Sequence, residues 1–300
     1  MNAFSVEAFA KVNRDLHVLG KRPDGYHELD TIFQTIDLTD EIRFLEREDG
    51  ELVLTIAGAS QPVSEENLIL RAARDLRERV GSRVGASIHL SKRIPIGGGL
   101  GGGSSNAAAA LLGLRALWNL PATDADLHAL AAAIGSDVPF FLVGGRARGA
   151  GRGEILRPLA DGPEEWLVLV FPPFSLSTAV VYVALSAPPL TDSPGFSNLC
   201  SSDSGGGPDR NDLESAAESL QGGLRRFRLA LSDLGATSAR LSGSGSTVFG
   251  VFGDEESARR AFEGLAGLRE ETKATMMIVK TVSRAAFARR AMPPTIGQRG

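Results

Sequence analysis

The fold is decided by PIGGGLGGGSSNAAAALLGL, residues 95–114, where six glycines surround one leucine ahead of a run of alanines and leucines. Glycine has no Cβ and tolerates left-handed dihedrals, so this backbone can approach a ligand closely and turn successive N–H groups into one concavity. Apolar residues at helical spacing follow the glycines: Ala107, Leu111, Leu114 and Trp118. We therefore expect a helix from Ser104, capped by Ser104 or Ser105. Since a helix N-terminus carries unpaired N–H groups and about half a positive charge, the stretch predicts a phosphate-binding loop.

Two widespread phosphate-binding motifs do not fit this loop. Gly97-x-Gly99-x-x-Gly102 matches the dinucleotide fingerprint, but that fingerprint directly follows a hydrophobic strand, whereas SKRIP precedes this loop. The Walker A motif requires a lysine at the position of Ser104. We expect a phosphate loop of a third kind, and a nicotinamide oxidoreductase has no support beyond the accidental glycine match.

Composition excludes several classes of protein. The 300 residues suggest about two domains, and 43% apolar with 23% charged residues suffices for a large core. A net charge of −4 argues against nucleic acid as the main partner. The single cysteine, Cys200, excludes an internal disulfide and fits a reducing compartment. The chain shows neither a signal-peptide pattern nor an apolar run of ~18 residues, so we expect a cytoplasmic protein without membrane contact.

Strand-like and helical patterns alternate along the chain in a mixed order. Strands are expected at 4–9, 31–38, 41–45, 52–56, 86–90, 166–171, twice within 239–251, and at 276–282. Helices are expected at 69–80, from 104, from 123 to 134, at 178–185, 212–234 and 255–265. Thr123 can cap the third of these helices, with Asp126 three residues on. This order indicates an α+β protein. We place a domain boundary near 158, giving domains 1–158 and 159–290, a long Ser/Gly/Pro-rich loop at 186–210, and a disordered tail at 291–300.

Two charged residues stand in unusual settings. Lys11 lies within apolar strand text, AFAKVN, and Asp137 lies in IGSDVPFF, between the end of a helix and an expected apolar strand. Taken alone, Lys11 is typical of a lysine at a sheet edge whose side chain reaches solvent. Taken alone, Asp137 fits a structural turn aspartate and a catalytic aspartate equally well. Beside a phosphate loop, however, the lysine could hold the aspartate ionised while the aspartate accepts a proton from an attacking hydroxyl.

Three weaker signals remain. The glycine-rich segment LSGSGSTVF, residues 241–249, is either a hairpin turn or a backbone that approaches a substrate or the first loop. Tyr26 and His27 follow a Pro-Asp-Gly turn and are either surface residues or a pair that can stack on and hydrogen-bond a base. The four histidines and one cysteine have no metal-ligand spacing, so we expect no structural zinc.

Together these segments resemble the GHMP small-molecule kinases, and the matches run in order from residue 8 to about 250. The segments that carry the resemblance are AKVN, PDGYHEL, ENLILRAA, KRIPIGGGLGGGSSNAA, GSDVPFFL, GRGE, NDLE and ARLSGSGSTVF. PDGYHEL is the most specific of them. With this segment, the chain resembles the branch of the family that phosphorylates the 2-hydroxyl of a cytidine-diphosphate-linked methylerythritol in the non-mevalonate isoprenoid pathway.

The resemblance implies a two-domain α+β fold, with an N-terminal ATP-binding domain, a ferredoxin-like C-terminal domain and the active site in the cleft between them. It implies Lys11 and Asp137 as the catalytic pair, with ATP and Mg²⁺ as cofactors. It assigns to ATP the residues Pro95, Ile96, Gly97, Gly98, Gly99, Leu100, Gly101, Gly102, Gly103, Ser104, Ser105 and Asn67. It places Tyr26 and His27 on one side of a cytosine and Tyr182 on the other, and gives the substrate two further ligands, Asn13 and Thr178. The partner is then a small molecule, and the chain is a monomer or a homodimer.

One departure and two alternatives stand beside this interpretation. Arg14-Asp15 occupies a position that is usually apolar in the family, so the packing next to Lys11 is expected to differ. A GHMP kinase for mevalonate or homoserine would share the loop and Asp137 but has no use for a cytosine clamp. A non-catalytic nucleotide-binding protein of this fold would not need the Lys11–Asp137 pair.

Overall fold

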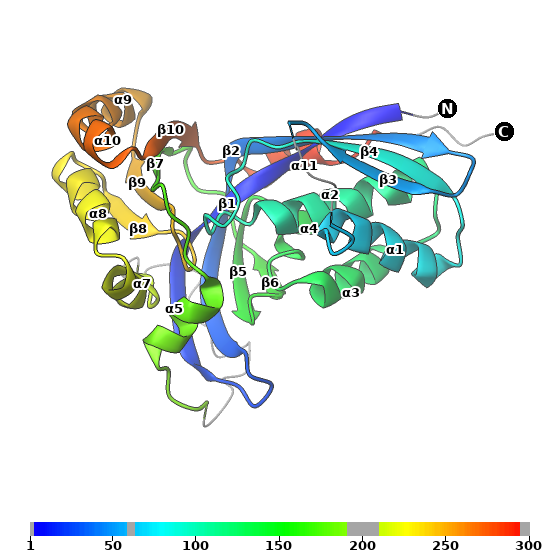
Figure 1. Ribbon diagram of the computed structural model, residues 1–300, viewed down its shortest axis with the longest axis horizontal. Coiled ribbons are helices and arrows are strands. Elements are labelled where there is room, and N and C mark those ends of the chain that lie inside the picture. Colours follow the sequence, from blue (N-terminus) through cyan, green and yellow to red (C-terminus); the bar gives the residue numbers. More distant parts are fainter. Residues whose placement is uncertain (1–2, 59–63, 191–209, 295–300) are drawn as a thin grey trace.

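The computed structural model describes residues 3–58, 64–190 and 210–294, and in them the chain forms two sheets with flanking helices (Figure 1). The first sheet has the order β3-β4-β2-β5-β6, with β1 paired to β2. Its strands are β1 (Ala3–Lys21), β2 (His27–Arg47), β3 (Leu52–Ile56), β4 (Gly85–Ser91), β5 (Arg146–Gly151) and β6 (Ile155–Pro158). The only parallel pair within this described sheet is β3 with β4. The segments expected as separate strands at 31–38 and 41–45 are one continuous strand, β2.

The hairpin of β1 and β2 is irregular, because its register shifts between Phe9 and Ala10, between Asn13 and Asp15, and between Val18 and Gly20. A β-bulge of this kind bends the strand and turns a side chain away from the regular alternation. The second shift lies two residues after Lys11, so the irregularity falls where the sequence suggested chemistry.

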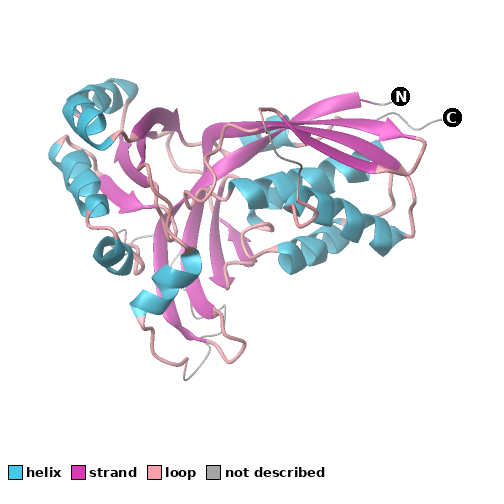
Figure 2. Cartoon of the chain, in the orientation of Figure 1, coloured by secondary structure: helices cyan, strands magenta, loops and turns pink. Residues whose placement is uncertain are grey.

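Helices cover one face of the first sheet, as Figure 2 shows. They are α1 (Leu68–Val80), α2 (Gly102–Leu117), α3 (Asp124–Ile134) and the short α4 (Phe140–Val143). α2 is central and buried almost all round, and its small side chains permit that position. A Cβ added to Gly113 would lie 2.4 Å from the Phe44 ring. α3 begins with the expected capping box of Thr123 and Asp126.

The second sheet has the order β10-β7-β9-β8 and is antiparallel throughout its described strands. Its strands are β7 (Trp166–Phe171), β8 (Ser238–Leu241), β9 (Val248–Phe252) and β10 (Thr275–Lys280). Its helices are α5 (Thr178–Leu185), α7 (Glu214–Leu220), α8 (Gly223–Asp233), α9 (Glu255–Gly264) and α10 (Ala266–Thr272). The elements follow the ferredoxin-like order, which is one strand, helices, two strands, helices and a last strand. The expected α+β fold, with its ferredoxin-like second half, is confirmed.

The last helix, α11 (Arg284–Ala291), was not predicted and returns to the first half of the chain. Its buried Phe287 packs against Phe9 of β1, with the ring centroids 5.3 Å apart. The chain therefore crosses back after β10, and the boundary near 158 remains a prediction. Residues 295–300 of the expected tail and 191–209 of the expected long loop lie outside the described residues.

Three local expectations were wrong. The segment after Asp137 is the helix α4 and not a strand. The N-cap of α2 is Gly101, and neither Ser104 nor Ser105 caps this helix. The helical segment expected at 212–234 is divided into α7 and α8. Among the described residues, no helix combines the length and the apolar character needed to span a membrane.

Candidate active site

Two glycine-rich loops meet between the two sheets. The first, residues 97–103, leads from the segment after β4 into α2, and the second, residues 242–247, connects β8 to β9. The backbone N–H of Thr247 donates to the carbonyl of Gly98 at 3.2 Å, and the Ser242 hydroxyl donates to the carbonyl of Gly99 at 2.9 Å. A Cβ on Gly99 would lie 2.1 Å from the Ser242 carbonyl oxygen, so only glycine permits this approach. The second loop is thus both a strand connection and a support for the first loop.

The first loop alternates left-handed residues with others. Gly97, Gly99 and Gly101 have φ of 74°, 75° and 71°. Such alternation turns successive N–H groups toward one side and makes an anion-binding concavity. It ends at the N-terminus of α2, where the first N–H groups of a helix have no partner within the helix. Leu100 is buried, and its carbonyl accepts from the N–H of Lys11 at 3.0 Å, which ties the loop to β1.

A buried carboxylate that the sequence analysis missed holds the other side of this loop. Asp40 of β2 is fully buried and accepts from the N–H groups of Arg93 and Ile94 at 2.7 and 2.8 Å. It also accepts from the Lys92 ammonium at 2.7 Å and from the Asn106 amide at 2.8 Å. These four donors flank the glycines on both sides, so Asp40 fixes where the loop begins and where α2 starts.

Lys11 and Asp137 lie together at the floor of the site. The Lys11 Nζ is 3.4 Å from Asp137 Oδ2 and donates to Asn13 Oδ1 at 2.6 Å. Lys11 is buried, whereas the Asp137 side chain is 33% exposed and therefore open to a ligand. Asp137 owes its position to the break between α3, which Gly135 ends, and α4, which Pro139 begins. The structure brings the two residues together as the sequence suggested.

A cavity of about 780 Å³ opens over this pair. Among the residues expected to bind ligands, those that line it are Lys11, Asn13, Tyr26, His27, Gly99, Gly101, Asp137, Thr178 and Tyr182. Two cations, Lys21 and Arg152, and the hydroxyl of Ser244 also line it, and the sequence analysis did not single them out. Ser244 lies in the segment LSGSGSTVF and Arg152 lies in GRGE, two segments that the sequence had marked, but only the fold shows which of their side chains reach the cavity.

Asn67 lies outside this cavity and caps α1, where its Oδ1 accepts from the N–H of Ile69 at 2.9 Å. The neighbouring Leu68 approaches the loop, since its Cδ1 is 3.6 Å from the place that a Cβ on Gly103 would take. Asn67 therefore stands near the end of the loop, with its amide N–H₂ not used in the cap. Of the remaining loop residues, Ile96 is almost fully exposed and Ser105 is buried.

The aromatic residues are arranged differently from the expected clamp. His27 and Tyr182 stack directly on each other, with centroids 4.6 Å apart and planes inclined by 23°. A base between two rings requires a separation of roughly 7 Å, so none fits between these two in this arrangement. Tyr26 is half-exposed and lies under the Arg152 guanidinium at 4.7 Å. His27 thus stacks on Tyr182. The expected clamp instead placed His27 with Tyr26 on one side of a cytosine and Tyr182 on the opposite side.

Burial sets the protonation of this stacked pair. Burial lowers the pKa of His27, and the charge of Lys21 lowers it further, so the imidazole is neutral at neutral pH. A neutral imidazole offers one donor and one acceptor. Burial also raises the pKa of Tyr182, with a smaller contribution from the Asp137 charge, so its phenol keeps its proton.

Comparison with known proteins places this site in a family. The family model "GHMP kinases N terminal domain" matches residues 67–145, and "GHMP kinases C terminal" matches residues 197–268. The 4-diphosphocytidyl-2-C-methyl-D-erythritol kinase of Pelotomaculum thermopropionicum is 44% identical over 261 residues, which cover 84% of this chain and 90% of that protein. The enzyme of the same name from Moorella thermoacetica is 41% identical over 293 residues, covering 94% of this chain and 100% of that protein.

Solved structures agree with this placement. A crystal structure of 4-(cytidine 5'-diphospho)-2C-methyl-D-erythritol kinase superposes with a TM-score of 0.73 at 38% identity, covering 92% of this chain and 99% of that one. A mevalonate kinase superposes with a TM-score of 0.66 at 16% identity, covering 93% of this chain and 99% of that one, which shows a shared fold.

We expect Gly101→Ala to weaken ATP binding about tenfold or more while the protein stays folded. The residue has φ of 71°, and an added Cβ would lie 2.7 Å from the Phe141 ring, so the loop must move. A left-handed conformation alone costs a non-glycine residue about 1–3 kcal/mol. Calorimetric titration with ATP measures the affinity, and circular dichroism checks the fold. Gly222→Ala is the control, since Gly222 has φ of −57° and nothing within 4 Å of its Cβ position. Unchanged ATP affinity in Gly101→Ala would remove the phosphate-loop assignment.

Proposed function

The chain belongs to the 4-diphosphocytidyl-2-C-methyl-D-erythritol kinases within the GHMP kinases, and we propose that it transfers the γ-phosphoryl group of ATP to the 2-hydroxyl of 4-diphosphocytidyl-2-C-methyl-D-erythritol. The observation that carries this proposal is the Lys11–Asp137 pair, 3.4 Å apart, at the floor of a cavity bordered by the glycine loops. Identity of 41–44% with enzymes of that name supports the choice of substrate.

In the proposed reaction, Asp137 accepts the proton of the substrate hydroxyl as its oxygen attacks the γ-phosphorus. The bond between that phosphorus and the bridging oxygen to the β-phosphate breaks, and ADP leaves. Lys11 pairs with the Asp137 carboxylate and stabilises the negative charge on the transferred group. The 33% exposure of Asp137 supports this assignment, because a base must reach the hydroxyl that it deprotonates.

The phosphates of ATP are proposed to lie on Pro95 to Ser105, a segment that comprises the first loop and the N-terminus of α2. Its left-handed glycines and the free N–H groups of the helix supply donors without a lysine in the loop itself. The position of Asn67 beside the end of this loop supports a contact of its amide with the nucleotide.

The protein oxygens available suit a Mg²⁺ ion that binds together with ATP. Within residues 3–58, 64–190 and 210–294, no group of three or more acidic, histidine or cysteine side chains could form a metal cage. Mg²⁺ commonly takes one or two protein oxygens and completes its shell with phosphates and water. The half-buried Ser104, at the start of α2, is the oxygen donor that we assign to it. Bound there, Mg²⁺ would neutralise charge on the β- and γ-phosphates.

The far end of the cavity suits the cytidine diphosphate. The neutral His27 can meet the edge of a cytosine with one donor and one acceptor, and Tyr182 and Tyr26 offer ring faces. Lys21 and Arg152 carry the positive charge that a diphosphate needs. Thr178, hydrogen-bonded to Ser244 at 2.8 Å, and Asn13 are proposed as further substrate contacts. A mevalonate or homoserine kinase has no need of this aromatic and cationic end.

We expect Asp137→Asn to lower kcat by about 10²- to 10⁴-fold, because the variant keeps the shape of the site but cannot accept a proton. The Kd for ATP should change by no more than about threefold, since the loop that binds the phosphates is untouched. Coupled measurement of ADP release gives kcat, and calorimetry gives the Kd. Asp233→Asn, at an exposed position of α8, serves as the control. A kcat close to that of the wild type would make Asp137 a turn residue only.

We expect Tyr182→Ala to weaken binding of the cytidylyl substrate by about ten- to a hundredfold, since base stacking on an aromatic ring contributes about 1–3 kcal/mol. Affinity for ATP should barely change. Separate calorimetric titrations with ATP and with the cytidylyl substrate measure the two affinities. The wild type should phosphorylate mevalonate and homoserine far more slowly than the cytidylyl substrate. Loss of ATP affinity with normal cytidylyl binding would contradict the recognition role and favour another GHMP kinase.

A further inference from the structure

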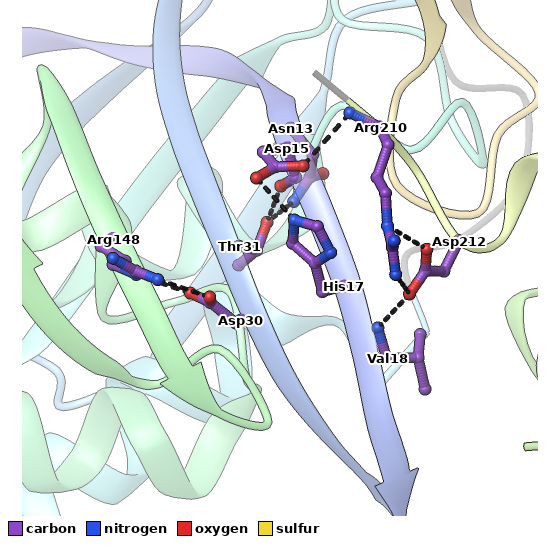
Figure 3. A network of polar contacts seen from close by, with 9 residues as sticks. All are labelled: Asn13, Asp15, His17, Val18, Asp30, Thr31, Arg148, Arg210 and Asp212. Atoms are coloured by element: carbon purple, nitrogen blue, oxygen red, sulfur yellow. Dashed lines mark hydrogen bonds and ion pairs between the residues drawn. The ribbon is translucent and has the colours of Figure 1, made fainter. Parts of the chain in front are cut away.

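A chain of directed hydrogen bonds leads from the proposed catalytic lysine to the neighbouring strand. Lys11 Nζ donates to Asn13 Oδ1 at 2.6 Å, and Asn13 Nδ2 donates to Thr31 Oγ1 at 2.8 Å. The Thr31 hydroxyl in turn donates to the backbone carbonyl of Asp15 at 2.6 Å. Figure 3 shows the part of this chain between Asn13, Thr31 and Asp15. All three side chains in the chain, from Lys11 to Thr31, are buried, and they lie at the wall of the cavity.

The direction of every bond in the chain follows from its two ends. A lysine ammonium can only donate, and a backbone carbonyl can only accept. The single hydroxyl hydrogen of Thr31 therefore goes to Asp15, and its oxygen is left to accept from Asn13. An asparagine amide has two different ends, so the end that faces Thr31 must be the NH₂. The oxygen of Asn13 is then turned toward Lys11, which is the only orientation that holds the ammonium.

The bulge of β1 supplies the acceptor at the far end. In the register of β1 and β2, Asn13 faces Phe33 and Asp15 faces Ile32, so Arg14 is the additional residue. Polar contacts hold this bulge in place: Arg14 pairs with Glu165, and the Asp15 carboxylate accepts from the N–H of Arg210 at 3.2 Å. His17 contacts the same carboxylate at 2.7 Å, and that hydrogen bond raises the pKa of His17. The Arg14-Asp15 pair thus fixes the position of the Asp15 carbonyl.

We propose that Thr31 is a positioning residue of the kinase, which sets the orientation of the Asn13 amide and through it the position of the Lys11 ammonium. The inference rests on the proposed function, because it assumes that Lys11 serves phosphoryl transfer. Without the Thr31 hydroxyl, the Asn13 NH₂ loses its acceptor, and within this chain only the bond from Lys11 still orients the amide. The amide and the ammonium bound to it can then shift from the position 3.4 Å from Asp137 that the complete chain fixes.

The test is a double-mutant cycle on the whole protein with Thr31→Val, Asn13→Ala and the combined variant. Thr31→Val removes the hydroxyl at nearly constant volume and should lower kcat by about 10- to 100-fold, since misplacement of a reacting group by about 1 Å has effects of this size. KM for both substrates should change by less than about threefold. Thr31→Ser keeps the hydroxyl and should restore most of the kcat. In the Asn13→Ala background, Thr31→Val should have no further effect.

The outcomes separate two kinds of failure. If the wild type does not phosphorylate the cytidylyl substrate, the proposed function has failed. If the wild type is active and Thr31→Val is equally active, the inference is wrong. It is also wrong if the fold-decreases in kcat caused by Thr31→Val and by Asn13→Ala multiply in the combined variant. A rise in KM for the cytidylyl substrate with normal kcat would also overturn it, because Thr31 would then contact the substrate directly. Thr31→Ala, compared with Thr31→Ser, replaces Thr31→Val if the valine variant does not fold.

Discussion

The contact between the two glycine loops is the interaction on which the rest of the structure depends. Gly98 and Gly99 accept hydrogen bonds from Thr247 and Ser242, and these bonds join the two halves of the chain where the cavity opens. Because the Ser242 carbonyl comes within 2.1 Å of the Cβ position of Gly99, this approach is closed to every other residue type. The packing of backbone on backbone therefore accounts for part of the glycine density in the first loop, beside the phosphate binding that we propose for it.

Much of this arrangement could be predicted from local sequence. The glycine loop, the helix after it and the Thr123 capping box depend on residues close together in the chain, and each was correctly expected. The errors arose where distant contacts decide. A short apolar run such as that after Pro139 has no periodicity to separate strand from helix. Asp40 was missed because its donors lie more than fifty residues away, and the stacking of His27 on Tyr182 depends on how the two halves meet.

The cavity divides its tasks between its two ends. At the floor, Lys11 is buried and hydrogen-bonded, and it stands beside the partly exposed Asp137, so one charge is fixed while the other remains accessible. At the rim, Tyr26 is half-exposed and the cations Lys21 and Arg152 leave room for a larger anionic group. A rigid floor and a more open rim suit the proposed reaction, because orientation then governs the rate and the remote part of the substrate supplies affinity.

The role of Asp137 as the base is tested most directly by a crystal structure of the protein with a non-hydrolysable ATP analogue and 4-diphosphocytidyl-2-C-methyl-D-erythritol. We expect the 2-hydroxyl oxygen about 2.6–3.2 Å from an Asp137 carboxylate oxygen. We also expect the γ-phosphate between Lys11 and the amides of the first glycine loop. A complex in which that hydroxyl bonds to another group, with Asp137 directed away from it, would show that Asp137 is not the base.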